Sequence, residues 1–564
     1  MGFQVSPGVQ VNEVDLTNVI PTVSTSIAGM VGNFRWGPVE EVTAVISEID
    51  LVDKFGTLKS TGVTSTAIAD EIAAYFLPAQ GFLKYGSNLK IYRATGSGQL
   101  NASSGPAQSG KGEVLIKNTE AYSALTSGLP ADIYARYPGT LGNSLKVVVL
   151  DDDGMNQANE ETAVKALFNT VHGTDSALAN ENEVNIAVID EDGVITGTAG
   201  TVLETFERVS LVAGTKALDG SSAFINDVLY EKSEWIYAGL NATFASDSSD
   251  LFDDSPTTEG GVYVYSLTGG VDVAIDAADI ATAFDTAFIP DSVEVNLLIG
   301  AFKSGYTSAN AQSVVTVAST RKDCFAFVSP DIADTKNVAR ATATTNVVQF
   351  ADGMTTDSYG ALDSTALYVY DKYNNKYHYI VAAGHVAGLA ANTDDVADPW
   401  FSPAGFNRGG LRGVTKLAYN PAKTDRDTLY KSRVNPIVSF PGQGTVLFGD
   451  KTLQAKASAF DRINVRRLFI TLQKAISISA EAQLFEINDE FTRANFRNAV
   501  EPFLREVKGR RGINDFFVVC DETNNTGNII DTNQFVADIF IKPARSINFI
   551  TLNFVATRTG VEFN

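Results

Sequence analysis

The stretch that decides the fold is IDAADIATAFDTAF at residues 275–288, followed by VNLLIG at 295–300 and CFAFVS at 324–329. The first segment carries its apolar residues at helical spacing, and the other two are short, continuously apolar runs, which are typical of buried strands. Another such run, ALYVYD, occupies residues 366–371. Helical patterns that alternate with apolar strands indicate parallel βαβ units. We therefore expect residues 201–415 to form an α/β middle domain.

The same two patterns occur toward the N-terminus. The apolar run SIAGMVGNF begins at residue 26, AIADEIAAYFLPAQGFL at 67–83 has a helical pattern, and LKIYRA follows at 89–94. Residues 21–95 are therefore predicted to form a small α/β unit. Residues 96–112 are rich in Gly and Ser, which is typical of a flexible connector, and short strands follow them. We expect residues 96–200 to be an inserted, β-rich domain.

The C-terminal third combines helices with strands. The segment DRINVRRLFITLQKAI at 461–476 predicts a helix for which Asp461 is a reasonable N-cap. A second helix is expected from about Glu490 to Lys508, and Pro502 should kink it or end it early. Apolar strands are expected after it, so residues 416–545 are predicted to form an α+β domain.

Both ends of the chain read as single, unanchored strands. VSPGVQVNEV lies within residues 1–20 and SINFITLNFVAT lies within residues 546–564. A lone apolar strand exposes unpaired backbone groups unless a sheet receives it. Each end either joins a sheet of its own chain or is donated to the sheet of a neighbouring subunit.

Composition narrows the class of protein. The 564 residues are 44% hydrophobic and 19% charged, a balance that favours several globular domains. The net charge is −23, but residues 1–400 carry 21 basic and 50 acidic side chains, whereas residues 401–564 carry 22 and 16. An acidic chain of this kind argues against nucleic-acid binding. No apolar stretch reaches the length of a membrane span, and we expect no membrane insertion.

Three patterns could in principle carry chemistry, and each has a simpler explanation. Gly105 to Lys111 fits a phosphate-binding loop, but the required Ser or Thr is Gly112. Asp151 to Asp153 resembles the start of a calcium loop, yet position twelve is Thr162 rather than Glu. His385 could serve a Ser-His-Asp site with Asp394 or Asp395, but no nucleophile motif accompanies it. Cys324 and Cys520 lie in apolar runs, as buried thiols do. We predict no catalytic, cofactor or metal site.

Longer strings resemble a known family. They include SPGVQVNEVD at 6–15, FLKYGSNLKIYRA at 82–94 and PWFSPAGFNRGGLRGV at 399–414. VVCDETNNTGNIID at 518–531 and KPARSINFITLNFVAT at 542–557 complete the order. The chain resembles the tail sheath proteins of contractile-tailed bacteriophages over most of residues 1–95 and 200–564. Residues 96–200 depart most from the family pattern.

The resemblance implies a structural polymer and not an enzyme. Sheath subunits of that family stack as six-membered rings around an inner tail tube, and contraction drives the tube through the host envelope. It further implies a subtilisin-like topology for the middle region, an outward position for the insertion and an inner, tube-facing C-terminal domain. Baseplate and tail terminator proteins would be further partners, the virion tail the location, and the host cytoplasm the place of assembly.

The resemblance also assigns roles to particular residues. The terminal arms would be donated to neighbouring subunits through the strand residues Val9, Val11, Ile547, Phe549, Ile550 and Leu552. We hypothesise that an acidic inner tube is met by the basic residues Arg505, Lys508, Arg510 and Arg511. The alternatives are a receptor- or carbohydrate-binding virion spike, which predicts compact trimers, and a hydrolase that uses His385.

Overall fold

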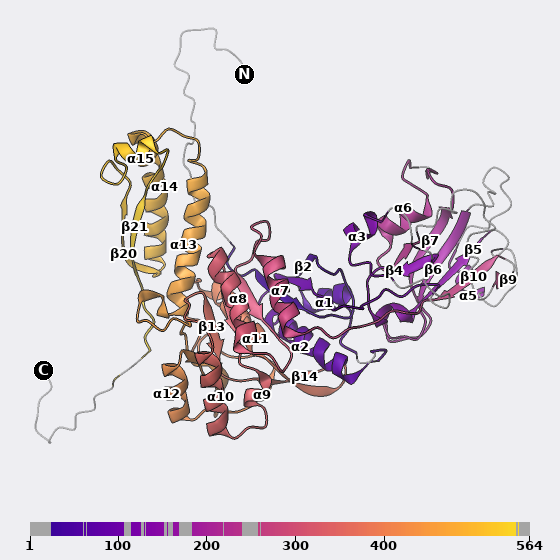
Figure 1. The fold of residues 1–564 in the computed structure, drawn as a ribbon, viewed down its shortest axis with the longest axis horizontal. Coiled ribbons are helices and arrows are strands. Elements are labelled where there is room, and N and C mark those ends of the chain that lie inside the picture. The colour runs from indigo at the N-terminus through magenta and orange to yellow at the C-terminus, as the bar shows by residue number, and fades with distance from the viewer. Residues whose placement is uncertain are drawn as a thin grey trace, which may run out of the picture.

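The computed structural model shows an elongated molecule with a central body, an antiparallel module at one end and a C-terminal domain that projects from the other (Figure 1). It describes residues 24–548 and residue 551, except for residues 60, 64, 106–113, 126–128, 130, 152–154, 156–161, 169–182, 218, 240–257 and 260.

A seven-stranded sheet forms the core of the central body. Its order is β17-β13-β12-β11-β1-β3-β2, and every pair is parallel except β2 with β3 at one edge. The strands are β1 (Ala28–Gly32), β2 (Val42–Val45), β3 (Leu89–Arg93), β11 (Leu297–Gly300), β12 (Phe325–Val328), β13 (Gly360–Asp363) and β17 (Val434–Asn435). Apart from the edge strand β2, these strands are buried almost throughout, as the continuously apolar runs predicted.

Helices cover both faces of this sheet. A Cβ atom placed on Gly29 of β1 would meet Phe288 of α7 (Ala277–Phe288) at 2.8 Å. On the opposite face, a Cβ atom on Gly32 would meet Tyr75 of α2 (Thr66–Leu83), also at 2.8 Å. The other helices of the body are α1 (Glu48–Phe55), α8 (Ser308–Arg321), α9 (Ile332–Thr335), α10 (Arg340–Asp352), α11 (Ala383–Val396) and α12 (Lys423–Lys431).

Segments that are far apart in the sequence share the central sheet. β1 and β3 come from residues 21–95, yet β1 pairs with β11 from the middle region, with Ala28 opposite Leu297. The expected small unit and the expected middle domain therefore share one sheet and one hydrophobic core. Smaller sheets complete the body, formed by β14 (Leu367–Asp371), β15 (Lys376–Ile380) and β16 (Val414–Leu417), and by β18 (Ile437–Phe440) with β19 (Gly444–Leu447).

The β-rich insertion is an antiparallel module that continues past residue 200. Its sheet has the order β7-β6-β5-β10-β9. The predicted boundary falls between β6 and β7, which pair along their length. Local patterns could not reveal this pairing, and the module extends to β10. Its elements are β4 (Ile133–Ala135), β5 (Leu145–Leu150), β6 (Glu183–Asp190), β7 (Thr201–Ser210), β8 (Ile236–Ala238), β9 (Thr258–Glu259), β10 (Val262–Ser266), α3 (Thr119–Ser123), α5 (Thr162–Lys165), α6 (Ile225–Lys232) and the 3₁₀ helix η1 (Thr140–Ser144).

The C-terminal domain pairs two long helices with a hairpin. The helices are α13 (Ile463–Glu481) and α14 (Glu490–Gly509), and the hairpin is β20 (Ile513–Val519) with β21 (Asp538–Pro543). The predicted cap at Asp461 is wrong, because Arg462 is the N-cap of α13 and Asp461 ends the short 3₁₀ helix η3 (Ala459–Asp461). Pro502 does not end α14 early, since the helix continues to Gly509. Along the chain, a short helix, α15 (Gly527–Asp531), connects the two strands of the hairpin.

Candidate functional site in the C-terminal domain

The C-terminal domain buries one apolar face and exposes another. Its core is formed by Leu468 and Leu472 of α13 together with Phe496, Val500 and Leu504 of α14. Asp489 caps α14, since its side chain accepts a hydrogen bond from the backbone N–H of Thr492 at 2.8 Å. The domain is thus held together by its own helices, and its remaining surface is available for other contacts.

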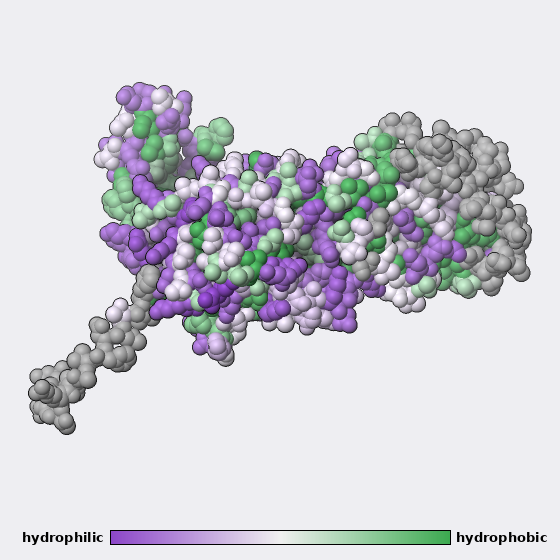
Figure 2. Space-filling model, turned by 60° about the horizontal axis from the view of Figure 1, so that its bottom comes forward, coloured by the Kyte–Doolittle hydropathy of each residue, from purple (hydrophilic) through white to green (hydrophobic). Residues whose placement is uncertain are grey.

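Large apolar side chains gather on that remaining surface. Eight of the 19 exposed large hydrophobic side chains among the described residues lie between residues 463 and 543. Figure 2 shows green side chains on the projecting part at the upper left. The eight are Ile478, Leu484, Phe485, Ile487, Phe491, Phe517, Ile530 and Phe540. Apolar surface of this density on one domain marks an interaction site.

The connection between α13 and α14 is the most exposed apolar segment. Leu484, Phe485 and Ile487 lie in it, and Phe485 has its whole side chain in solvent. The backbone of Phe485 is in the left-handed region, with φ at 71°. This conformation is unfavourable for a bulky residue, and the aromatic ring it carries is exposed.

The β20–β21 hairpin offers open strand edges. Within the part of the chain that the structure describes, the two strands pair only with each other. One face of the hairpin packs toward α14 through Phe516 and Ile541. The other face exposes the cross-strand pair Phe517 and Phe540, whose ring centroids are 6.4 Å apart. A hairpin of this kind can accept a further strand at either edge.

The four basic residues proposed for the tube face lie around the end of α14, but they are not equally free. Arg510 pairs with Asp398 of the central body, and its guanidinium lies 5.5 Å from the ring of Trp400. Lys508 pairs with Asp515 at 3.0 Å, and Arg505 is 3.9 Å from Glu501. Arg511 lines a groove between the C-terminal domain and the central body. Lys508 lines the same groove. Arg505, with 71% of its side chain exposed and only a long contact to Glu501, is therefore the freest of the three paired residues, and the ion pair of Arg510 links the C-terminal domain to the central body.

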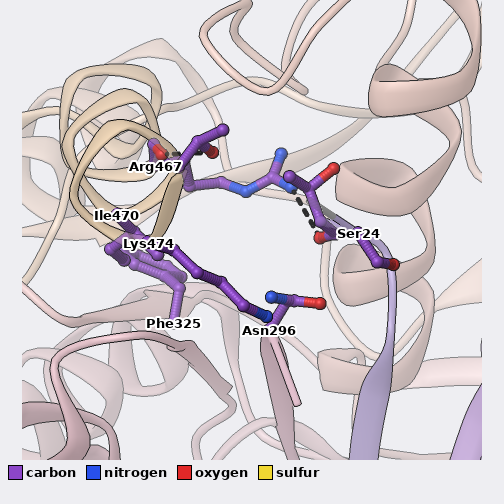
Figure 3. Close-up of a pocket in the computed structure, with 8 residues that line it drawn as sticks. Ser24, Asn296, Phe325, Arg467, Ile470 and Lys474 are labelled. Carbon is purple, nitrogen blue, oxygen red and sulfur yellow. Dashed lines mark hydrogen bonds between the residues drawn. The ribbon is translucent and has the colours of Figure 1, made fainter. Parts of the chain in front are cut away.

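The N-terminal segment leaves the described structure beside α13. Figure 3 shows the guanidinium of Arg467 directed at the backbone near Ser24, with the labelled residues Lys474, Asn296 and Phe325 below it. The Nη2 atom of Arg467 donates to the carbonyl oxygen of Thr25 at 3.4 Å. The arm residues Val9 and Val11 lie outside the described residues.

Arg467 is itself held by the central body. Its Nη2 atom lies 2.6 Å from Oδ2 of Asp394, and both side chains are almost completely buried. Its Nη1 atom donates to the carbonyl oxygen of Ala390 in the last turns of α11. Burial raises the pKa of Asp394, and the Arg467 guanidinium opposes that rise. Arg467 thus offsets the negative charge that Asp394 adds to the last turn of α11, where a carboxylate is unfavourable.

The C-terminal segment leaves from a polar cluster on the central body. Oδ2 of Asp450 accepts from the hydroxyl of Ser546 at 2.7 Å, and Oδ1 accepts from Nδ2 of Asn548 at 2.9 Å. The hydroxyl of Tyr430 accepts from Asn548 at 2.7 Å and from Arg462 at 2.6 Å. Of the predicted arm residues, Ile547 is 83% exposed, and Phe549, Ile550 and Leu552 lie outside the described residues.

The residues considered for catalysis do not assemble into a site. His385 is fully buried with neither ring nitrogen hydrogen-bonded, and burial lowers its pKa to about 3. Asp394 pairs with Arg467 rather than with this histidine. Cys324 and Cys520 are both buried free thiols. Among the described residues no group of His, Cys, Asp and Glu could hold a metal ion. No described helix is long and apolar enough to cross a membrane.

Several of these features were not predicted from the sequence. The apolar connection AQLFEIND at residues 482–489 joins two predicted helices, and three large apolar residues in a turn could have signalled a contact surface. The roles of Arg467, Asp450 and Tyr430 carry no local signal. Their partners lie between 12 and 442 residues away along the chain.

Comparisons with known proteins agree with this arrangement. Residues 274–453 match the family described as the phage tail sheath protein central domain, and residues 455–557 match the phage tail sheath C-terminal domain. The first match covers α7 and four strands of the central sheet, β11, β12, β13 and β17. The second covers α13, α14 and the hairpin.

Similar proteins extend the match to the whole chain. The tail sheath protein of Vibrio phage KVP40 is 33% identical over 99% of both chains. The tail sheath protein of Enterobacteria phage T4 is 30% identical over 99% of this chain and 98% of its own. Among solved structures, a sheath tail protein from Listeria innocua has a TM-score of 0.54 at 13% identity, with 93% of each chain covered. That likeness shows a shared fold.

Proposed function

The chain belongs to the phage tail sheath protein family and is a structural subunit of a contractile tail, not an enzyme; from this premise we propose how it works. Subunits polymerise as stacked hexameric rings around an inner tail tube. Contraction of this sheath drives the tube through the host cell envelope. The observation that carries the proposal is the C-terminal domain, whose exposed apolar residues and open hairpin edges leave binding surface that one subunit does not cover.

The terminal arms link neighbouring subunits by strand donation. Val9 and Val11 would join the sheet of one neighbour, and Ile547, Phe549, Ile550 and Leu552 that of another. A donated strand contributes a ladder of backbone hydrogen bonds with alternate side chains packed beneath it. The β20–β21 hairpin is the receiving sheet that this proposal favours, because both of its edges lack a strand neighbour among the described residues. Head-to-tail links of this kind propagate without closing.

The basic end of α14 faces the inner tube. Arg505, Lys508, Arg510 and Arg511 are proposed there as a group, and Arg505, 71% exposed and 3.9 Å from Glu501, is the least restrained of those that form an ion pair within the subunit. Exposed ion pairs are individually weak, at about 0–1 kcal/mol each, and are screened by salt. A grip of this kind can be released during contraction.

The tube-facing proposal has a direct test. The double variant Arg505→Glu with Lys508→Glu should weaken sheath assembly on purified tubes at low salt, and added salt should narrow the difference from the wild type because it screens these charges. The matched control, Lys322→Glu with Lys336→Glu, changes the same charge on the central body. Equal assembly of the variant and the wild type would refute the assignment of these two residues.

The remaining assignments concern the larger parts. We place the antiparallel module on the outside of the sheath, the central body between, and residues 416–545 toward the tube. Subtilisin-like topology is proposed for the middle region on family resemblance alone. Baseplate and tail terminator proteins are the expected partners at the two ends, and assembly is proposed to take place in the host cytoplasm before the virion tail is complete.

Electron microscopy of the purified full-length protein tests the proposed function. Hollow tubules, formed alone or on added tubes, support the sheath mechanism. Discrete trimers would instead favour a receptor- or carbohydrate-binding spike. Hydrolase activity that disappears in a His385→Ala variant would favour an enzyme, but the burial of both ring nitrogens argues against it.

A further inference from the structure

Two separate observations place both arm roots at the start of one helix. The N-terminal root is Thr25, whose carbonyl oxygen is bound by Arg467. The C-terminal root is Ser546 with Asn548, which are bound by Asp450 and Tyr430. Arg462, the N-cap of α13, reaches that second cluster.

Several polar contacts converge on one carboxylate at the C-terminal root. Asp450 is buried, yet its two carboxylate oxygens receive Ser546, Asn548, Tyr430 and Arg462 at distances from 2.7 to 3.4 Å. Arg462 donates to Tyr430 at 2.6 Å and also lies 3.4 Å from Asp450. A buried carboxylate that is satisfied by several donors fixes their relative positions.

The start of α13 is joined to this cluster through the backbone. The N–H of Ile463 donates to the carbonyl oxygen of Asp450 at 2.8 Å, and Lys451 forms an isolated β-bridge with Arg462. Arg467 follows five residues later on the same helix, about 7.5 Å along its axis at 1.5 Å per residue. The two roots are therefore tied to one rigid element.

We propose that the first turns of α13 are a common anchor for both arms, in which Arg462 and Arg467 act as positioning residues. The anchor consists of these two arginines with Tyr430, Asp394 and Asp450. It sets the direction in which both arms leave toward neighbouring copies of the chain. A rotation of the subunit in the lattice then turns both links together. This inference rests on the proposed role of the arms in linking subunits.

The chemistry of the anchor favours orientation over stability. Burying an ion pair such as Arg467 with Asp394 costs desolvation energy that the pairing only partly returns, so such a pair is weak evidence for added stability. Ser546 and Asn548 come from a stretch without regular structure. Their side chains nevertheless converge on one carboxylate.

The first test uses trypsin, because exposed Arg545 directly precedes the C-terminal root. In the full-length unassembled protein, separated by size exclusion, the Ser546→Ala with Asn548→Ala variant should be cut after Arg545 about tenfold faster than the wild type, because three hydrogen bonds are lost. Tyr430→Phe, which keeps the ring, should give a smaller increase. Asn528→Ala on exposed α15 is the control and should change nothing. Equal cleavage of all four proteins would overturn the anchor.

The second test asks whether the two roots are coupled. Arg467→Lys keeps the charge beside Asp394 but shortens the reach to Thr25 and Ala390, and it touches nothing at the C-terminal root. With a common anchor, this variant should also speed cleavage after Arg545 by several-fold. Leu472→Val, in the core of α13, controls for general destabilisation. Cleavage no faster than in that control would mean that each root is held independently, which contradicts the proposal.

The outcomes separate the anchor from the proposed function. Tubules formed by the wild type, together with no effect of these variants on cleavage, would overturn the anchor alone. If the variants show the predicted cleavage pattern but the wild type forms no sheath on added tubes, the proposed function is overturned. The anchor is then still supported.

Discussion

The carboxyl group of Asp363, at the end of β13, links the stability of the central body to pH. It is completely buried and is hydrogen-bonded by the hydroxyl of Ser329 and the N–H of Thr365. Burial raises its pKa to about 7 from an ordinary value of 3.8. The folded state therefore holds a proton that the unfolded state releases at lower pH.

We predict that the free energy of unfolding falls as pH rises from about 4 to 7, because a raised carboxyl pKa contributes stability only while the proton stays bound. A pKa difference of one between the folded and unfolded states corresponds to about 1.4 kcal/mol. Asp363→Asn should flatten this part of the profile. Urea unfolding of the unassembled subunit at several pH values measures it, and parallel profiles for both proteins would refute the prediction.

Gly384 in α11 should tolerate no side chain. A Cβ atom there would lie 2.2 Å from the carbonyl oxygen of Pro78 in α2. Gly384→Ala should therefore destabilise the subunit by about 1–3 kcal/mol or more, because two helix backbones must separate. Gly509→Ala at the end of α14 is the control, since nothing lies within 4 Å and alanine favours a helix. Thermal unfolding compares the two, and equal melting temperatures would contradict the close packing.

At the scale of elements, the sequence patterns predicted the helices and strands better than their partners. The periods of α2, α7, α13 and α14 are local properties, and these helices appear where expected. The pairing of β1 with β11 depends on residues about 270 positions apart, and no local pattern encodes it. The domain boundary expected at residue 200 is misplaced for the same reason, because β6 and β7 pair with each other across it.

The connection between α13 and α14 should matter for assembly and not for folding. Leu484→Ser, Phe485→Asn and Ile487→Ser combined should leave the free energy of unfolding within about 0.5 kcal/mol of the wild type, because these side chains are exposed. Asn also tolerates the left-handed backbone of Phe485. The lowest protein concentration that yields tubules should rise about tenfold, or about 1.4 kcal/mol per subunit.

Val212→Ser provides the control for that variant. Val212 is an exposed apolar residue of the antiparallel module, away from the C-terminal domain. Tubule formation measured by sedimentation should match the wild type for the control and fall for the triple variant. A triple variant that assembles normally would show that this connection stays outside every interface.

At the scale of the whole molecule, removal of residues 1–15 should separate folding from assembly. The described core begins at Ser24 and does not include these residues. The truncated protein should keep the circular dichroism spectrum and melting temperature of the full chain, yet form no tubules. Tubules of normal length would mean that the N-terminal arm is dispensable. Loss of the folded state would mean that the arm belongs to the subunit's own core.

The sequence predicted only the general region of the candidate site and not the contacts of its residues. The charge imbalance pointed to residues 401–564, and family resemblance named the arms. The ion pair of Arg510 with Asp398 spans 112 residues, and that of Arg467 with Asp394 spans 73. A list of basic residues cannot separate those that bind a partner from those that neutralise a distant acid of their own chain.

The chain passes from the central body into the antiparallel module and back through two adjacent segments. Leu100 and Val271 form an antiparallel bridge there, with backbone hydrogen bonds of 3.4 and 3.2 Å. A two-residue turn could therefore close the chain at this point in place of the module. The same junction could carry a foreign domain whose ends lie close together. Each ring would then present the graft at regular intervals, so this bridge is a natural site for engineering the tail as a display scaffold.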